Sequence, residues 1–104
     1  EDALQTAQRE LREETGFSSE DWQALGHYRV DPNRGVACGD LFLARHAVPA
    51  GERIIDDLEE QRLQLMTRAQ IESALEVGEF KVLAWAAALA LALRKLDEEE
   101  QHAA

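Results

Sequence analysis

The sequence has 104 residues, of which 45% are hydrophobic and 31% charged, with a formal net charge of −10, as is typical of one small soluble globular domain. The acidic balance argues against a nucleic acid partner, which needs clustered Lys and Arg, but allows a phosphorylated ligand that cations bridge to the protein. The single Cys38 excludes an intrachain disulfide and fits a reducing, cytoplasmic compartment. Because no apolar run reaches the ~20 residues that span a bilayer, we expect no membrane partner.

The periodicity of apolar residues predicts, in chain order, a helix over 2–15, strands over 22–30, 40–47 and 62–66, a helix over 68–76 and a final helix over 81–96. Leu4, Ala7 and Leu11 form the apolar stripe of the first helix, and Gly16 is its expected C-terminal cap. Thr67 is the expected N-terminal cap of the helix over 68–76.

Three carboxylates, Glu10, Glu13 and Glu14, crowd the C-terminal end of the first helix, where the helix dipole is negative. Each acid there costs roughly 0.3–1 kcal/mol, and their mutual repulsion adds to this penalty. On a helical wheel they fall within about 100° of one another, beside the apolar stripe. A hard divalent cation such as Mg²⁺ or Mn²⁺ would neutralise them, and the alternative is an ordinary solvated helix.

The spacing of defined residues in this helix resembles the Nudix box of the Nudix hydrolases. It comprises Glu1, seven residues, Arg9-Glu10-Leu11, one residue, Glu13-Glu14, one residue and Gly16-Phe17. Only the leading glycine of the box and the loop after it lie outside this chain, which begins at Glu1 as a fragment or processed product would. The resemblance implies an α/β Nudix-type α/β/α sandwich with a mixed sheet whose N-terminal strands are missing. It divides one partial domain, 1–104, into a box helix (1–17), strands and loops (18–66) and C-terminal helices (67–104).

The resemblance also implies an activity and a set of site residues. Members of the family split a nucleoside diphosphate linked to another group, with the help of divalent metal ions. The positions of Glu10, Glu13 and Glu14 would hold Mg²⁺ or Mn²⁺, and Glu10 and Glu13 are also catalytic candidates. Arg9 would orient these carboxylates, with Glu1 as its partner.

Two later segments carry further candidates. Asp57 and Glu59 belong to an acidic loop over 52–60, similar in place to the catalytic loop of the sugar-nucleotide branch, although a solvated loop is the alternative. Pro32 follows Gly16 by sixteen residues, which resembles a proline spacing in the ADP-ribose and sugar-nucleotide pyrophosphatase branch. Pro32 and Arg34 are therefore candidates for substrate binding. The alternatives are that Pro32 only shapes a turn and that Arg34 is a solvated loop residue.

The final helix is apolar nearly all round, so three strands would have difficulty covering it. We therefore expect association, most simply as a homodimer with Trp85 and Leu89 near the contact. Two alternatives to an active enzyme stay open: a non-catalytic Nudix-like module that binds a nucleotide or a partner, and an inactive oligomeric fragment.

Overall fold

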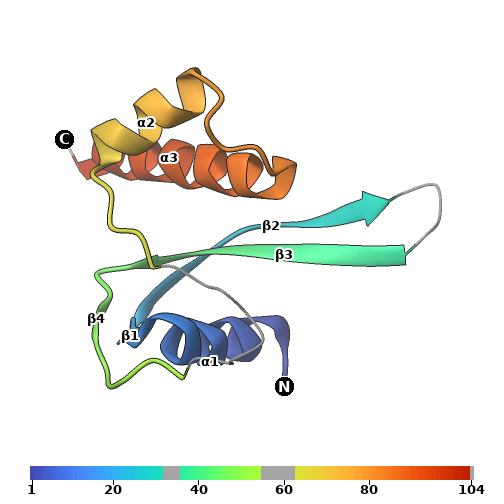
Figure 1. Cartoon of the computed structure of the whole chain (residues 1–104), viewed down its shortest axis with the longest axis vertical. Helices are drawn as coiled ribbons and strands as arrows, with labels where there is room; N and C mark the ends of the chain where they lie inside the picture. The colour runs from blue at the N-terminus through green and yellow to red at the C-terminus, as the bar shows by residue number, and fades with distance from the viewer. Residues whose placement is uncertain (32–35, 55–62, 104) are drawn as a thin grey trace. The chain divides into compact units, whose positions relative to one another are not determined.

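The computed structural model describes residues 1–31, 36–54 and 63–103, and their contacts divide the chain into two compact units, Glu1–Leu63 and Gln64–Ala104. Figure 1 labels the elements, which are α1 (Ala3–Thr15), β1 (Phe17–Ser18), β2 (Asp21–Asp31), β3 (Val36–Arg45), β4 (Val48–Pro49), α2 (Arg68–Glu76) and α3 (Leu83–Ala103). This mixture of helices and strands confirms the predicted α/β class. The division of residues 1–104 within a single partial domain stays a prediction.

Helix α1 is determined by local signals at both of its ends. The Asp2 carboxylate accepts from the Gln5 backbone N–H at 2.8 Å, and the Gln5 side chain accepts from the Asp2 N–H at 2.9 Å, which forms a capping box. Gly16 ends the helix in the left-handed region, with φ of 76°, and its N–H donates to the Arg12 carbonyl at 2.9 Å. The predicted helix is confirmed, with Asp2 as its cap.

The longest strands, β2 and β3, form an antiparallel hairpin. Trp22 on β2 meets Phe42 on β3 edge to face, with ring centroids 6.3 Å apart. The predicted bounds 40–47 for the second strand are wrong, because β3 begins earlier and stops at Arg45. His46 follows with φ of 54°, and a left-handed residue of this kind cannot continue an extended strand.

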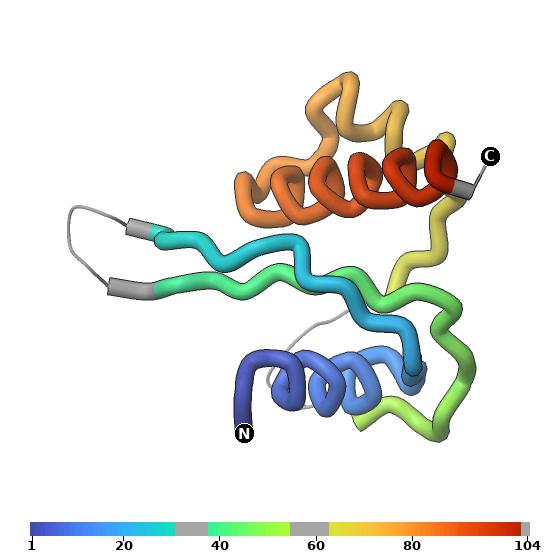
Figure 2. Tube along the Cα trace, turned by 180° about the vertical axis from the view of Figure 1, so that it is seen from behind, coloured from blue at the N-terminus to red at the C-terminus, as the bar shows by residue number. Residues whose placement is uncertain are grey.

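The pairing of the other two strands brings the chain back to α1. β1 pairs with β4 in an antiparallel ladder, and Figure 2 shows the chain that leaves β4 returning towards the end of α1. Both ladders are antiparallel, so within the described ranges the strands show no parallel pair of the expected mixed sheet.

In the second unit, α2 begins at a capping box. The Thr67 hydroxyl accepts from the Gln70 N–H at 3.1 Å, and the Gln70 side chain accepts from the Thr67 N–H at 2.8 Å. Arg68, the first residue of α2, binds Asp97 and Glu100 on α3. These ion pairs offset part of the repulsion among the acids at 97–100, a stretch over which α3 continues to Ala103, beyond the predicted end at residue 96.

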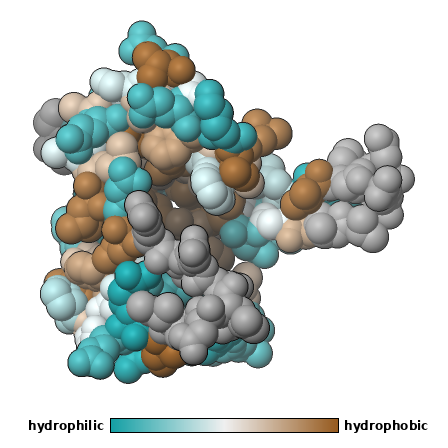
Figure 3. Space-filling model, in the orientation of Figure 1, coloured by the Kyte–Doolittle hydropathy of each residue, from teal (hydrophilic) through white to brown (hydrophobic). Residues whose placement is uncertain are grey.

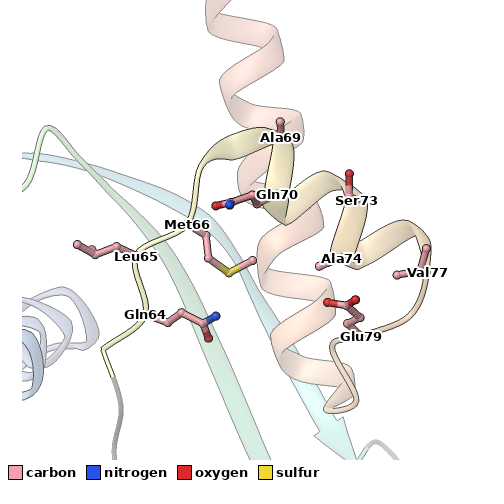
Figure 4. A pocket seen from close by; sticks show the side chains of 9 residues that line it. All are labelled: Gln64, Leu65, Met66, Ala69, Gln70, Ser73, Ala74, Val77 and Glu79. Atoms are coloured by element: carbon pink, nitrogen blue, oxygen red, sulfur yellow. The ribbon is translucent and has the colours of Figure 1, made fainter.

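The predicted strand over 62–66 is wrong for the part that the structure describes, since residues 63–66 have no strand partner. Leu65, one of the apolar residues of that alternating pattern, is 81% exposed. Residues 64–66 instead form one side of a groove of about 650 Å³ along α2. Figure 4 shows the residues that line it: Gln64, Leu65, Met66, Ala69, Gln70, Ser73, Ala74, Val77 and Glu79.

The described chain has very little core of its own. Ala74, at 5% exposed, is its one buried hydrophobic residue among those whose burial the structure describes. Leu83 and Trp85, at the start of α3, are 85% and 62% exposed, and Figure 3 shows further apolar surface. The exposure of these two residues concerns the first turn of α3, and the expected association stays a prediction. No described helix combines the length and apolar character needed to cross a membrane.

Candidate active site

The central contact on the exposed face of α1 is an arginine shared by two carboxylates. The Arg9 guanidinium donates from Nε to Glu1 Oε1 at 2.8 Å and from Nη1 to Glu13 Oε2 at 3.0 Å. The structure therefore brings together three of the predicted site residues. The pair with Glu13 spans one helical turn, and the pair with Glu1 reaches back past the N-terminal cap. Arg9 thus binds Glu13 on the helix that carries the acids.

The contact between Arg9 and Glu1 shifts the pKa of both groups. The hydrogen bond from Arg9 lowers the pKa of the Glu1 carboxyl below its ordinary value of 4.5, and the same bond raises the pKa of Arg9. Because the folded pKa of Glu1 is depressed, the pair adds stability that is present above about pH 4.5 and is lost as the pH falls through the folded value.

We expect Arg9→Ala to return the pKa of Glu1 towards 4.5, which an NMR titration of its carboxyl carbon measures. The unfolding midpoints of this variant and the wild type should converge as the pH falls below 4.5. Arg94→Ala, which removes an exposed arginine from α3, is the matched control and should leave the Glu1 titration unchanged. An unaltered Glu1 titration in Arg9→Ala would refute the contact.

The C-terminal end of α1 is held by the segment that follows β4. The Ile54 N–H donates to the Glu13 carbonyl at 2.6 Å, Arg53 Nε donates to the Glu14 carbonyl at 2.6 Å, and the Ala50 N–H donates to the Gly16 carbonyl at 2.7 Å. Carbonyls at a helix end lack intrahelical donors, so these bonds satisfy groups that would otherwise need water. We call residues 50–54 the clamp segment. It also places a guanidinium at the negative end of the helix dipole, beside the acids.

Gly16 is required where the clamp segment crosses the helix end. A Cβ on Gly16 would lie 2.7 Å from the Gly51 carbonyl oxygen, closer than side-chain atoms approach a backbone. Its φ of 76° is a conformation that residues with a Cβ rarely adopt. The glycine therefore allows both the turn and the close approach.

A hollow of about 350 Å³ lies beside the acids, between α1 and β3. Its lining residues are Glu1, Asp2, Ala3, Thr6, Ala7, Glu10, Asp40 and Phe42. The Asp40 carboxylate lies 2.8 Å from His27 Nδ1 across the hairpin, and it accepts a hydrogen bond when that nitrogen carries the proton. Sequence reasoning did not select Asp40, because only the register of β2 against β3 and the packing of β3 on α1 bring it near Glu10.

Comparison with known proteins identifies the family. A family model described as NUDIX domain matches residues 1–86. The chain belongs to the Nudix family. A crystal structure described as an ADP compounds hydrolase is similar to it, with a TM-score of 0.77 and 25% identity. The match covers 95% of this chain and 53% of that one, so the chain spans about half the length of that structure. No curated protein matches.

The donor atoms of the Nudix box residues can be compared with those that a divalent ion prefers. Glu10, Glu13 and Glu14 all project from the last turns of α1, and carboxylate oxygens are the donors that Mg²⁺ and Mn²⁺ prefer. In the described part of the chain, no three His, Cys, Asp or Glu side chains are grouped closely enough to hold a metal ion. Glu13 turns towards Arg9 instead. The carboxylate oxygens are therefore of the type that suits a hard cation, while the arrangement described here pairs Glu13 with Arg9.

The remaining Nudix candidates fall outside the described residues. Asp57 and Glu59 lie within 55–62, and Pro32 and Arg34 lie within 32–35. In the chain, Asp57 and Glu59 follow Ile54 by three and five residues. Of the loop over 52–60, the structure places Arg53 and Ile54, which are bonded to the Glu14 and Glu13 carbonyls at the end of α1.

Proposed function

We propose that the protein hydrolyses the pyrophosphate of a nucleoside diphosphate linked to another group, either an ADP-ribose-like compound or a sugar nucleotide, with a divalent metal ion. The observation that carries this proposal is the complete set of box carboxylates on one helix, with Arg9 bound to Glu1 and Glu13. Membership of the Nudix family and similarity to a structure described as an ADP compounds hydrolase support the substrate class. ADP-ribose itself, and Mg²⁺ or Mn²⁺ as the ion, are parts of the proposal.

The residues have distinct parts in this reaction. Glu10, Glu13 and Glu14 would hold Mg²⁺ or Mn²⁺, which when bound screens the diphosphate charge and lowers the pKa of a coordinated water. Arg9 orients Glu13 through the bond at 3.0 Å. A carboxylate then accepts the proton of the attacking water.

Further candidates complete the site. Asp57 and Glu59 join Glu10 and Glu13 as candidates for the general base. Pro32 and Arg34 are proposed to border the substrate, with Arg34 as a phosphate contact.

Two observations favour other functions. The described residues lack a ready group of three metal-binding side chains, which suits a Nudix-like module that binds a nucleotide or a partner without turnover. The small core of the described chain suits an inactive oligomeric fragment.

An assay of the full-length protein separates these possibilities. With ADP-ribose or a sugar nucleotide and Mg²⁺ or Mn²⁺, we expect two phosphomonoesters to form, because water adds at phosphorus and the bridging P–O bond breaks. A sample with EDTA is the control and should be inactive. Ligand binding by calorimetry without product formation would instead establish a binding module.

We propose that the protein functions as a homodimer in the cytoplasm. The exposed side chains of Leu83 and Trp85 are a surface that a second copy would cover, and Leu89 is expected near the same contact. Cys38 is free and exposed, which fits a reducing compartment.

Sedimentation equilibrium at micromolar concentration should show twice the mass of the chain. Trp85→Glu should shift the equilibrium towards the single chain, because a charge would be buried at the contact. Tyr28→Glu on β2, also exposed, should leave it unchanged. A single-chain species with cooperative unfolding in the wild type would contradict the dimer.

A further inference from the structure

The bonds between the clamp segment and α1 fall on the residues that carry the metal-binding candidates. The carbonyl of Glu13 accepts from the Ile54 N–H, and the carbonyl of Glu14 accepts from Arg53 Nε, each at 2.6 Å. These are the backbone groups of the same two residues whose side chains are proposed to hold the ion. A change in either bond therefore moves the Cα atoms from which the two carboxylates project.

Arg53 is suited to hold this end of the helix by both its shape and its charge. It is partly buried, and its Nε–H points along the plane of the guanidinium, which gives the bond to Glu14 a defined direction. The clamp segment also passes so close to Gly16 that a Cβ added there would lie 2.7 Å from the Gly51 carbonyl oxygen. Together these contacts stop the last turn of α1 from fraying, as unsupported helix ends do.

We propose that Arg53 is a positioning residue for the site: by binding the Glu14 carbonyl it fixes the end of α1 from which the proposed metal-binding carboxylates of Glu13 and Glu14 project. This inference rests on the proposed function for its role in hydrolysis, but the contact itself does not. In this assignment Arg53 does not touch substrate and acts through the helix end. No local sequence signal points to Arg53, because it is 39 residues from Glu14 in the chain.

A position effect and a charge effect predict opposite changes in metal affinity. If Arg53 acted only as a nearby positive charge, its removal would strengthen binding of a cation. If Arg53 positions the carboxylates, its removal weakens binding, and loss of supporting contacts around a metal typically costs about 10–100-fold in affinity or activity. The sign of the change in Kd therefore decides between the two.

The experiment measures Mn²⁺ binding to the full-length protein by electron paramagnetic resonance, without substrate. Arg53→Met keeps the aliphatic stem and removes every donor, and we expect the Kd for Mn²⁺ to rise about 10-fold. Arg53→Lys restores a charged donor and should recover most of the affinity. Arg94→Met, which removes an arginine from α3, is the control and should bind as the wild type does. For hydrolysis of ADP-ribose, kcat should fall about 10-fold in Arg53→Met, with KM changed less than about 2-fold.

Amide hydrogen exchange of the metal-free protein tests the contact independently. The Ile54 amide should exchange at least about 10-fold faster in Arg53→Met than in the wild type. Unchanged exchange, or Mn²⁺ binding as tight as or tighter than that of the wild type, would overturn the inference. The proposed function fails by a different result, namely that Glu13→Gln with Glu14→Gln leaves Mn²⁺ binding and hydrolysis intact.

Discussion

Replacing Glu13 and Glu14 together by Gln should lower the rate of pyrophosphate hydrolysis at least about 10²-fold, since charge stabilisation by the metal is expected to be the main catalytic contribution. Gln has nearly the shape of Glu, and the Glu13 side chain is 35% exposed, so the change should remove charge without opening a cavity. Steady-state kinetics with saturating Mg²⁺ measure the effect. A fall in kcat larger than any rise in KM would show that the carboxylates act mainly in the transition state.

The matched control for this double variant removes the same number of negative charges from residues outside the Nudix box. Glu20→Gln with Glu76→Gln also removes two exposed acids, one in the turn before β2 and one at the end of α2. We expect its rate to stay within about 2-fold of the wild type, because surface changes away from a site have small effects. Equal rates for the box variant and the control would remove the basis for assigning hydrolysis to the carboxylates of α1.

Gly16→Ala should destabilise the fold by about 2–4 kcal/mol, a large part of the stability of a small domain. A residue with a Cβ pays roughly 1–2 kcal/mol for the left-handed conformation. Its Cβ would in addition meet the Gly51 carbonyl oxygen at 2.7 Å, so the clamp segment would have to move and lose hydrogen bonds to the helix end. Urea unfolding followed by circular dichroism measures the change.

Gly78→Ala separates the two contributions. Gly78 has nearly the same φ, 74° against 76°, but a Cβ added to it would meet no atom of the described residues within 4 Å. It should therefore lose only the conformational part, about 1–2 kcal/mol. The difference between the two variants isolates the close approach of the clamp segment. Equal losses would show that the segment does not press on Gly16.

Sequence reasoning succeeded where the signal is local. The start of the first helix near Asp2 and the cap at Thr67 were predicted, and the structure adds to each a glutamine three residues later that completes a capping box. Gly16 is required by the backbone conformation that ends α1. The bond from Arg9 to Glu13 likewise joins one turn of a helix.

Sequence reasoning was less successful where a bound or a contact depends on residues far apart. The end of β3 is decided by the left-handed conformation of His46, and the strand expected over 62–66 has no partner over its described part. An apolar alternation predicts a strand only if another strand pairs with it, and the pattern does not identify the partner.

By itself, therefore, the sequence determined the helix that carries the acids, its two ends and the family resemblance, since all three depend on fixed short spacings. Only the tertiary structure decided how that helix is supported. The bond from Arg53 to the Glu14 carbonyl spans 39 residues, and the hollow that joins Asp40 to Glu10 depends on the register of the hairpin and its packing on α1. Contacts of this kind leave no periodic trace in a sequence, because a hydrogen bond to a backbone carbonyl can be made by many side chains and selects no neighbouring residue type.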